Sequence, residues 1–189
     1  ISACLVGSEM CIRDSLDTFL EQAPEGTRVP RDLARLWDHL ESQGLAADDF
    51  LDLCEEEDVV NSFGFLAGES MDWLLLAGHE LIDNPRLVPI ANTDSTGSVA
   101  AMYFTDGHDP EYLFFDSDGA KPYRLAENTL DFLRLISIGY EEITPSYLYR
   151  EEHDELGLPE LLAPLRTWVA ETFDVQVPTA WPKVAKRPL

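Results

Sequence analysis

Short apolar runs separated by turn-forming residues constrain the fold of this chain most strongly. Connections rich in Asp, Ser and Gly separate the runs, which comprise residues 87–90, 99–104 and 112–115. Runs of this length with such punctuation are typical of antiparallel strands joined by tight turns. The middle run is apolar at nearly every position, which predicts a strand covered on both faces, whereas Pro89 favours an edge strand. The pattern predicts an antiparallel meander sheet over about residues 86–125.

Helical periodicity flanks this segment on both sides. Residues 30–44 begin with proline, end with glycine and carry apolar residues at helical spacing, which predicts a helix. A second helix is expected to begin at the capping residue Asp48 and to bury Phe50, Leu53 and Cys54. Further helices are predicted at residues 70–82, 128–139 and 163–173. The sequence therefore predicts a single α+β domain whose N-terminal and C-terminal helices cover the sheet.

The two ends of the chain differ from its middle. Residues 4–15 resemble a translated sequencing adapter, so we expect residues 1–15 to be a non-native leader. A signal peptide is the alternative, but no basic residue precedes the apolar stretch and Glu9 interrupts it. Residues 16–175 form the expected domain and residues 176–189 a Pro-rich basic tail. In that tail, Trp181 is expected either to anchor a contact with a partner or to fold back on the domain.

Negative charge is concentrated in one half of the chain. Between residues 36 and 120 the sequence has 19 carboxylates and one basic residue, Arg86, and the whole chain has a formal net charge of −23. The electrostatic field of so many carboxylates attracts cationic surfaces and repels nucleic acid and anionic membranes. A general adaptation to high salt is the alternative explanation, but the crowding of acids within residues 48–58 favours a directed patch.

Catalytic and cofactor-binding motifs are absent from the sequence. It contains no phosphate-binding Gly-rich loop, no Gly-x-Ser-x-Gly elbow and no His-Glu-x-x-His, so we predict neither an enzyme nor a cofactor. The alternative is a metal-dependent enzyme in which His108 acts with Asp106, Asp109 and Glu111. Only Cys54 of the three cysteines lies beyond the first eleven residues, and no apolar span is long enough to cross a bilayer. We therefore expect a soluble protein in a reducing cytoplasm.

Residues 87–143 resemble the SUKH superfamily of immunity proteins. The resemblance lies in the Leu-Val-Pro-Ile-Ala-Asn strand at residues 87–92, the Phe-Asp-Ser-Asp-Gly turn at residues 115–119, and the Leu-Ala-Glu-Asn entry at residues 125–128 into the following helix. It covers 57 of the 189 residues. The resemblance implies an α+β domain that binds and neutralises a bacterial toxin, often a nucleic-acid-directed enzyme, and that performs no catalysis itself.

Together, the charge and the resemblance predict a binding protein whose acidic face meets a basic toxin. No role in binding nucleic acid or membrane is expected. The interface is predicted to include the acidic run and three weaker candidates in the connections between strands: Asp48, Asp49, Asp52, Glu55, Glu56, Asp58, Asp94, Asp106 and Asp109.

Overall fold

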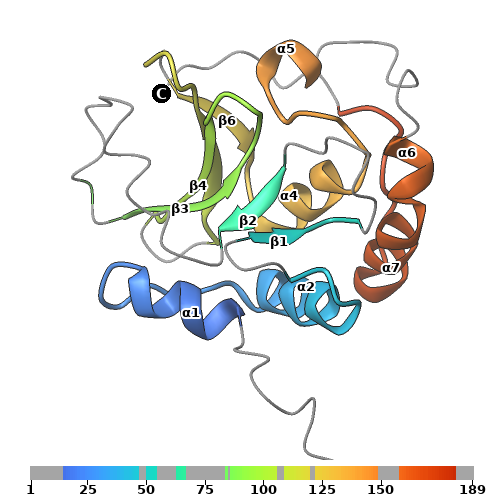
Figure 1. The fold of residues 1–189 in the computed structure, drawn as a ribbon, viewed down its shortest axis with the longest axis horizontal. Coiled ribbons are helices and arrows are strands. Elements are labelled where there is room, and N and C mark those ends of the chain that lie inside the picture. Colours follow the sequence, from blue (N-terminus) through green and yellow to red (C-terminus); the bar gives the residue numbers. More distant parts are fainter. Residues whose placement is uncertain are drawn as a thin grey trace, which may run out of the picture.

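The computed structural model describes residues 15–46, 50–54, 63–66, 84, 86–105, 109–119, 122–148 and 158–181, and all structural statements below concern these residues. They form an α+β domain in which a sheet is covered by helices (Figure 1). The strands are β1 Phe50–Asp52, β2 Gly64–Leu66, β3 Leu87–Asn92, β4 Val99–Tyr103, β5 Glu111–Phe115 and β6 Tyr123–Ala126. The helices are α1 Ser15–Gln22, α2 Arg31–Ser42, α4 Thr129–Ile136, α5 Pro145–Leu148, α6 Leu158–Leu161 and α7 Ala163–Phe173.

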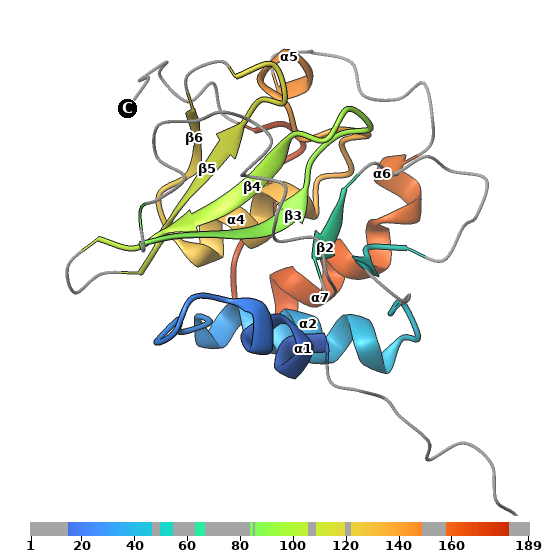
Figure 2. The ribbon, with the colours of Figure 1, turned by 60° about the vertical axis from the view of Figure 1, so that its left-hand side comes forward.

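The sheet is a six-stranded antiparallel meander in which the spatial order of the strands, β1 to β6, is their order in the sequence. Each strand pairs with the next, so β1 and β6 are the two terminal strands of the sheet. Figure 2 shows strands β2 to β6 in this order. The meander predicted over residues 86–125 is confirmed, and the sheet also extends to β1 and β2 on the N-terminal side.

The helix predicted to begin at Asp48 is wrong, because Phe50–Asp52 is strand β1. Leu51 and Leu53 are buried while Asp52 between them is exposed, which is the two-residue alternation of a strand. Antiparallel pairing with β2 fixes this conformation, with Leu51 opposite Phe65. A segment this short does not distinguish the two periods by itself.

The edge position predicted for Pro89 is also wrong. Strand β3 lies between β2 and β4, and the register with β4 shifts between Pro89 and Ala91. Proline has no N–H to donate to a ladder, and an irregularity of this kind accommodates it inside a sheet.

The main core lies between one face of the sheet and the helices α1, α2, α4 and α7. Trp37 of α2 is at its centre and meets two rings edge-on, Phe19 of α1 at 5.0 Å and Phe65 of β2 at 5.5 Å between centroids. The opposite face of the sheet carries a smaller buried group formed by Leu87, Ala101, Leu113, Phe115 and the partly buried Tyr103. Strand β4 is therefore buried on both faces, as predicted from its uninterrupted apolar sequence.

Three of the predicted helices are confirmed, as α2, α4 and α7. Asn128 caps α4 by accepting a hydrogen bond from the backbone N–H of Asp131 at 2.9 Å. The helix predicted at residues 70–82 lies outside the described residues. Helix α1 was not predicted, although its Phe19 is 1% exposed and packs into the core.

Candidate binding surface and pocket

The structure describes three of the nine predicted interface carboxylates, and these three have different surroundings. They are Asp52, Asp94 and Asp109. The other six lie outside the described residues: Asp48, Asp49, Glu55, Glu56, Asp58 and Asp106.

Asp52 is the one of these three that ends a terminal strand with an exposed side chain. Its backbone N–H donates to the carbonyl of Leu45 at 3.0 Å, and it lies opposite Gly64 of β2. Neighbouring protein atoms partly desolvate the carboxyl group and raise the pKa of Asp52 above its ordinary value. Asp52 is therefore accessible to a partner from the edge of the sheet.

Asp94 holds the turn between β3 and β4. Its Oδ1 accepts three hydrogen bonds of 2.9 Å, from the backbone N–H groups of Thr96 and Ser98 and from the hydroxyl of Thr96. The residue is only 9% exposed. Desolvation, and next the negative charge of Asp94, raise the pKa of the nearby Glu142. The arrangement is that of an Asx turn, so the carboxylate of Asp94 has a structural role.

Asp109 connects the start of β5 to the start of α4. Its Oδ2 accepts the backbone N–H of Thr129 at 2.7 Å, and its Oδ1 accepts the hydroxyl of the same residue at 3.0 Å. The Thr129 hydroxyl also lies 2.9 Å from the hydroxyl of Tyr112, whose pKa is raised by burial. A carboxylate at a helix N-terminus satisfies a free N–H and interacts favourably with the helix dipole. Both oxygens of Asp109 are thus used inside the fold.

The alternative metal site gains no geometric support from these residues. Asp109 is bound to Thr129, and Glu111 lies 3.6 Å from Arg124 in an ion pair. Asp106 and His108 are outside the described residues. Within the part of the chain that the structure describes, no group of three or more His, Cys, Asp or Glu side chains could hold a metal ion.

His39 of α2 is half-buried and stacks on Trp168 of α7. The ring centroids are 4.2 Å apart and the planes differ by 4°. Burial lowers the pKa of His39 below its ordinary value. His39 and Cys54 are among the residues that line a cavity of about 370 Å³ beside α2 and α7.

Trp181 folds back on the domain, which settles the two alternatives left by the sequence. Its indole N–H donates to the carbonyl of Leu125 at 3.1 Å, and its backbone N–H donates to the hydroxyl of Tyr140 at 2.8 Å. The residue is 8% exposed, so its side chain belongs to the core of the domain.

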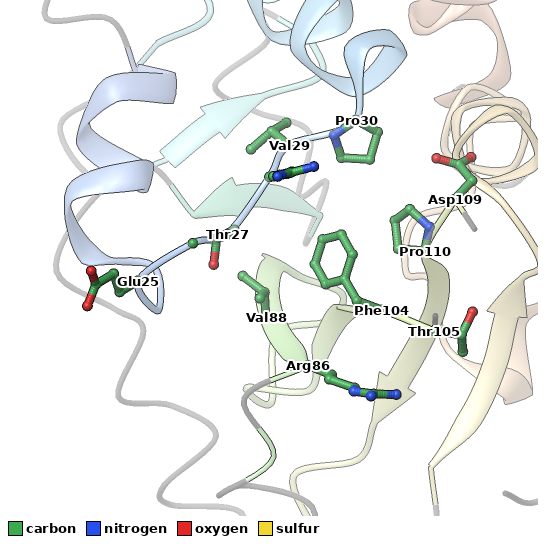
Figure 3. Close-up of a pocket in the computed structure, with 12 residues that line it drawn as sticks. Glu25, Thr27, Val29, Pro30, Arg86, Val88, Phe104, Thr105, Asp109 and Pro110 are labelled. Atoms are coloured by element: carbon green, nitrogen blue, oxygen red, sulfur yellow. The ribbon is translucent and has the colours of Figure 1, made fainter. Parts of the chain in front are cut away.

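A larger pocket, of about 590 Å³, was not predicted from the sequence. It lies where the loop between α1 and α2, residues 25–30, faces the adjacent ends of β3 and β4 and the start of β5 (Figure 3). Val29, Pro30, Phe104 and Pro110 contribute apolar walls, whereas Arg28, Arg86, Thr27, Thr105, Glu25 and Asp109 are the polar and charged residues that line it.

None of the helices in the described segments combines the length and the apolar character that crossing a bilayer requires. Comparison with known proteins gives no matching family model, no matching curated protein and no matching solved structure.

Proposed function

We propose that this chain is an immunity protein of the SUKH type that binds and neutralises a cognate toxin through an acidic surface. The toxin would carry a basic surface, as enzymes that act on nucleic acid commonly do. Binding would take place in the cytoplasm, where the thiol of Cys54, which is in no disulfide, stays reduced.

The charge distribution is the observation that carries this proposal. The segment of residues 36–120 has 19 carboxylates and a single basic residue. Concentrated like charge opposes compaction of the chain, but it accelerates association with a surface of opposite charge and disfavours wrong partners. This benefit requires a cationic partner.

Asp52 is the described residue on which the proposed interface is centred. It is exposed on a terminal strand, and the acidic residues of the run at positions 48–58 flank it in the sequence. Asp94 and Asp109 contribute charge to the field, but Oδ1 of Asp94 and both oxygens of Asp109 accept hydrogen bonds within the fold, and we do not propose these residues as direct contacts.

The experiment starts from the adjacent upstream gene, which the proposal expects to encode a secreted protein ending in a toxin domain. That domain is expressed with and without this chain, and rescue of growth is the expected result. The purified pair is then mixed at about 0.05 M and about 0.5 M salt, and the association rate is expected to fall about ten-fold or more at the higher salt. Failure to rescue growth, or an association rate that salt does not change, would contradict the proposal.

A pair of charge reversals localises the surface. Asp52→Lys is expected to slow association, whereas Glu127→Lys makes the same change in net charge at the opposite terminal strand, where Glu127 is exposed after β6. The control also removes an ion pair of 3.0 Å with Arg124, but exposed pairs contribute little to stability. Equal rates for the two variants would place the interface elsewhere.

A further inference from the structure

The cavity of about 370 Å³ beside α2 and α7 is lined by three parts of the chain that are far apart in the sequence. The lining residues lie within residues 39–45 at the end of α2, residues 53–54 after β1, and residues 161–165 across the junction of α6 and α7. Five leucines and Pro164 supply most of the wall. Three of these leucines are at most 4% exposed: Leu40, Leu53 and Leu165. The core of the domain therefore fixes much of the wall, and a ligand binds such a preformed surface without a large ordering cost.

The lining of this cavity carries no full charge. None of the described residues that line it is Asp, Glu, Lys or Arg, although 26% of the residues of the chain are charged. Moving an ionised group into such surroundings costs free energy, and no lining side chain of opposite charge offsets it. Water is poorly held there as well, because leucine side chains offer it no hydrogen bonds. The cavity therefore favours an uncharged and largely apolar occupant.

His39 gives the cavity a polar group with a fixed orientation. Its ring stacks on Trp168 with the centroids 4.2 Å apart and the planes differing by 4°. Desolvation lowers the pKa of His39, so at neutral pH the imidazole is uncharged and has one N–H donor and one acceptor nitrogen. Within the segments that the structure describes, neither ring nitrogen has a hydrogen-bond partner. The imidazole is thus able to pair with a polar group of a ligand.

We propose that this cavity binds an uncharged small molecule with a mainly apolar body and one hydrogen-bonding group, such as a carboxamide or a hydroxyl. The apolar body packs against the leucines, and the polar group pairs with the imidazole of His39. A volume of about 370 Å³ is within the range of small-molecule sites. This binding is independent of the toxin interaction proposed above.

The test is an NMR titration of the full ¹⁵N-labelled chain with 4-methylbenzamide and with two charged ligands of similar shape, 4-methylbenzoate and 4-methylbenzylammonium. Saturable shifts of the amides of Leu40, Leu53 and Leu165 are expected with the carboxamide. Affinity for each ion is expected to be weaker by about ten-fold or more, because the lining has no charge to pair with it. Absence of saturable shifts with the carboxamide, or equal or tighter binding of either ion, would overturn the proposal.

A substitution of His39 tests the polar contact. His39→Phe keeps a ring to stack on Trp168 and removes both ring nitrogens. Affinity for 4-methylbenzamide is expected to fall about three- to ten-fold, the net value of one hydrogen bond, whereas affinity for p-xylene, which has the same shape without the polar group, is expected to stay the same. No loss for the carboxamide, or an equal loss for the two ligands, would overturn the proposal.

A pair of matched substitutions tests the position of the site. Leu45 lines the cavity and is partly buried, so the larger ring of Leu45→Phe is expected to fill part of the space and to weaken binding of both uncharged ligands about ten-fold. Leu20→Phe makes the same change at a residue of α1 that is 39% exposed and outside the lining, and is expected to leave affinity unchanged. Equal affinities in the two variants would overturn the proposal.

Discussion

Asp109 clamps the first residue of α4, because its two carboxylate oxygens accept the backbone N–H and the hydroxyl of Thr129 at 2.7 and 3.0 Å. The two residues are 20 positions apart, so this contact ties the loop before β5 to the helix that follows β6. A carboxylate that the sequence offers as an interface group thus has a role in holding a helix against the sheet.

Replacing Asp109 by Asn is expected to destabilise the protein by about 1–2 kcal/mol, since hydrogen bonds to a charged acceptor are stronger than those to a neutral one. Asn also loses the favourable interaction with the helix dipole. Urea denaturation followed by circular dichroism measures the change. Asp118→Asn is the control, because Asp118 is exposed in the turn after β5. Equal unfolding midpoints for the two variants would contradict a stabilising role of the hydrogen bonds between Thr129 and Asp109.

Two substitutions of Asp94 test how much its hydrogen bonds stabilise the turn between β3 and β4. Asp94→Ala removes all three hydrogen bonds of 2.9 Å and leaves the buried N–H of Ser98 without this acceptor. An unsatisfied buried donor costs about 1–3 kcal/mol. Asp94→Asn keeps an acceptor oxygen and is expected to lose less. If thermal unfolding ranked Asn below Ala, the hydrogen-bond explanation would be wrong.

The elements predicted correctly from sequence are those with strong local signals. Helices α2 and α4 have several apolar residues on one face and a clear start, and β3, β4 and β5 are apolar runs between turns. Strand β1 has three residues, and its conformation depends on pairing with β2, which is a long-range contact. The local periodicity of the sequence does not reveal this pairing.

The site was harder to predict than the fold for the same reason. Asp52, Asp94 and Asp109 are equivalent in the sequence as acidic residues near turns or strand ends, and only the tertiary structure shows that the carboxylates of Asp94 and Asp109 accept backbone hydrogen bonds. The pocket joins residues 25–30 to residues 86, 88, 104, 105, 109 and 110, and no spacing within either part of the sequence indicates that they meet. Charge composition predicts the class of partner, whereas it does not predict which carboxylates are available.

Docking of Trp181 is expected to stabilise the whole domain rather than the end of the chain alone. Trp181→Ala removes a nearly buried indole and its bond to Leu125, for an expected loss of about 3 kcal/mol. Trp181→Phe keeps most of the apolar contact and loses the indole N–H, for an expected loss of about 1 kcal/mol. Urea denaturation measures both. Unfolding midpoints unchanged in Trp181→Ala would mean that this residue is not part of the cooperative unit.

Tyr140 supplies an independent check of the same contact. Its hydroxyl accepts the backbone N–H of Trp181 at 2.8 Å, and burial raises the pKa of Tyr140. Tyr140→Phe removes this acceptor with little change in shape, and a loss of about 1 kcal/mol is expected. Faster amide exchange of Trp181 in this variant, measured by NMR, is the specific sign; an unchanged exchange rate would contradict the bond.

His39 makes stability depend on pH near neutrality. Burial against Trp168 lowers its pKa in the folded state below the ordinary value of the unfolded chain, about 6.5. As pH falls through that value the unfolded state takes up the proton first, so this residue's contribution to stability decreases with acidification. The raised pKa values of Asp52 and Glu142 act in the opposite direction, which is why the effect is measured as a difference between two proteins.

The comparison is between the wild type and His39→Phe, which keeps a ring to stack on Trp168 and has no proton to exchange. Between about pH 7.5 and about pH 5.5, the wild type is expected to lose stability relative to the variant, because only the wild type must keep a buried imidazole neutral. Thermal unfolding at each pH gives the difference. Parallel curves for the two proteins would show that the imidazole of His39 titrates in the folded state as it does in the unfolded chain, and the stacked, desolvated environment would then have no energetic consequence.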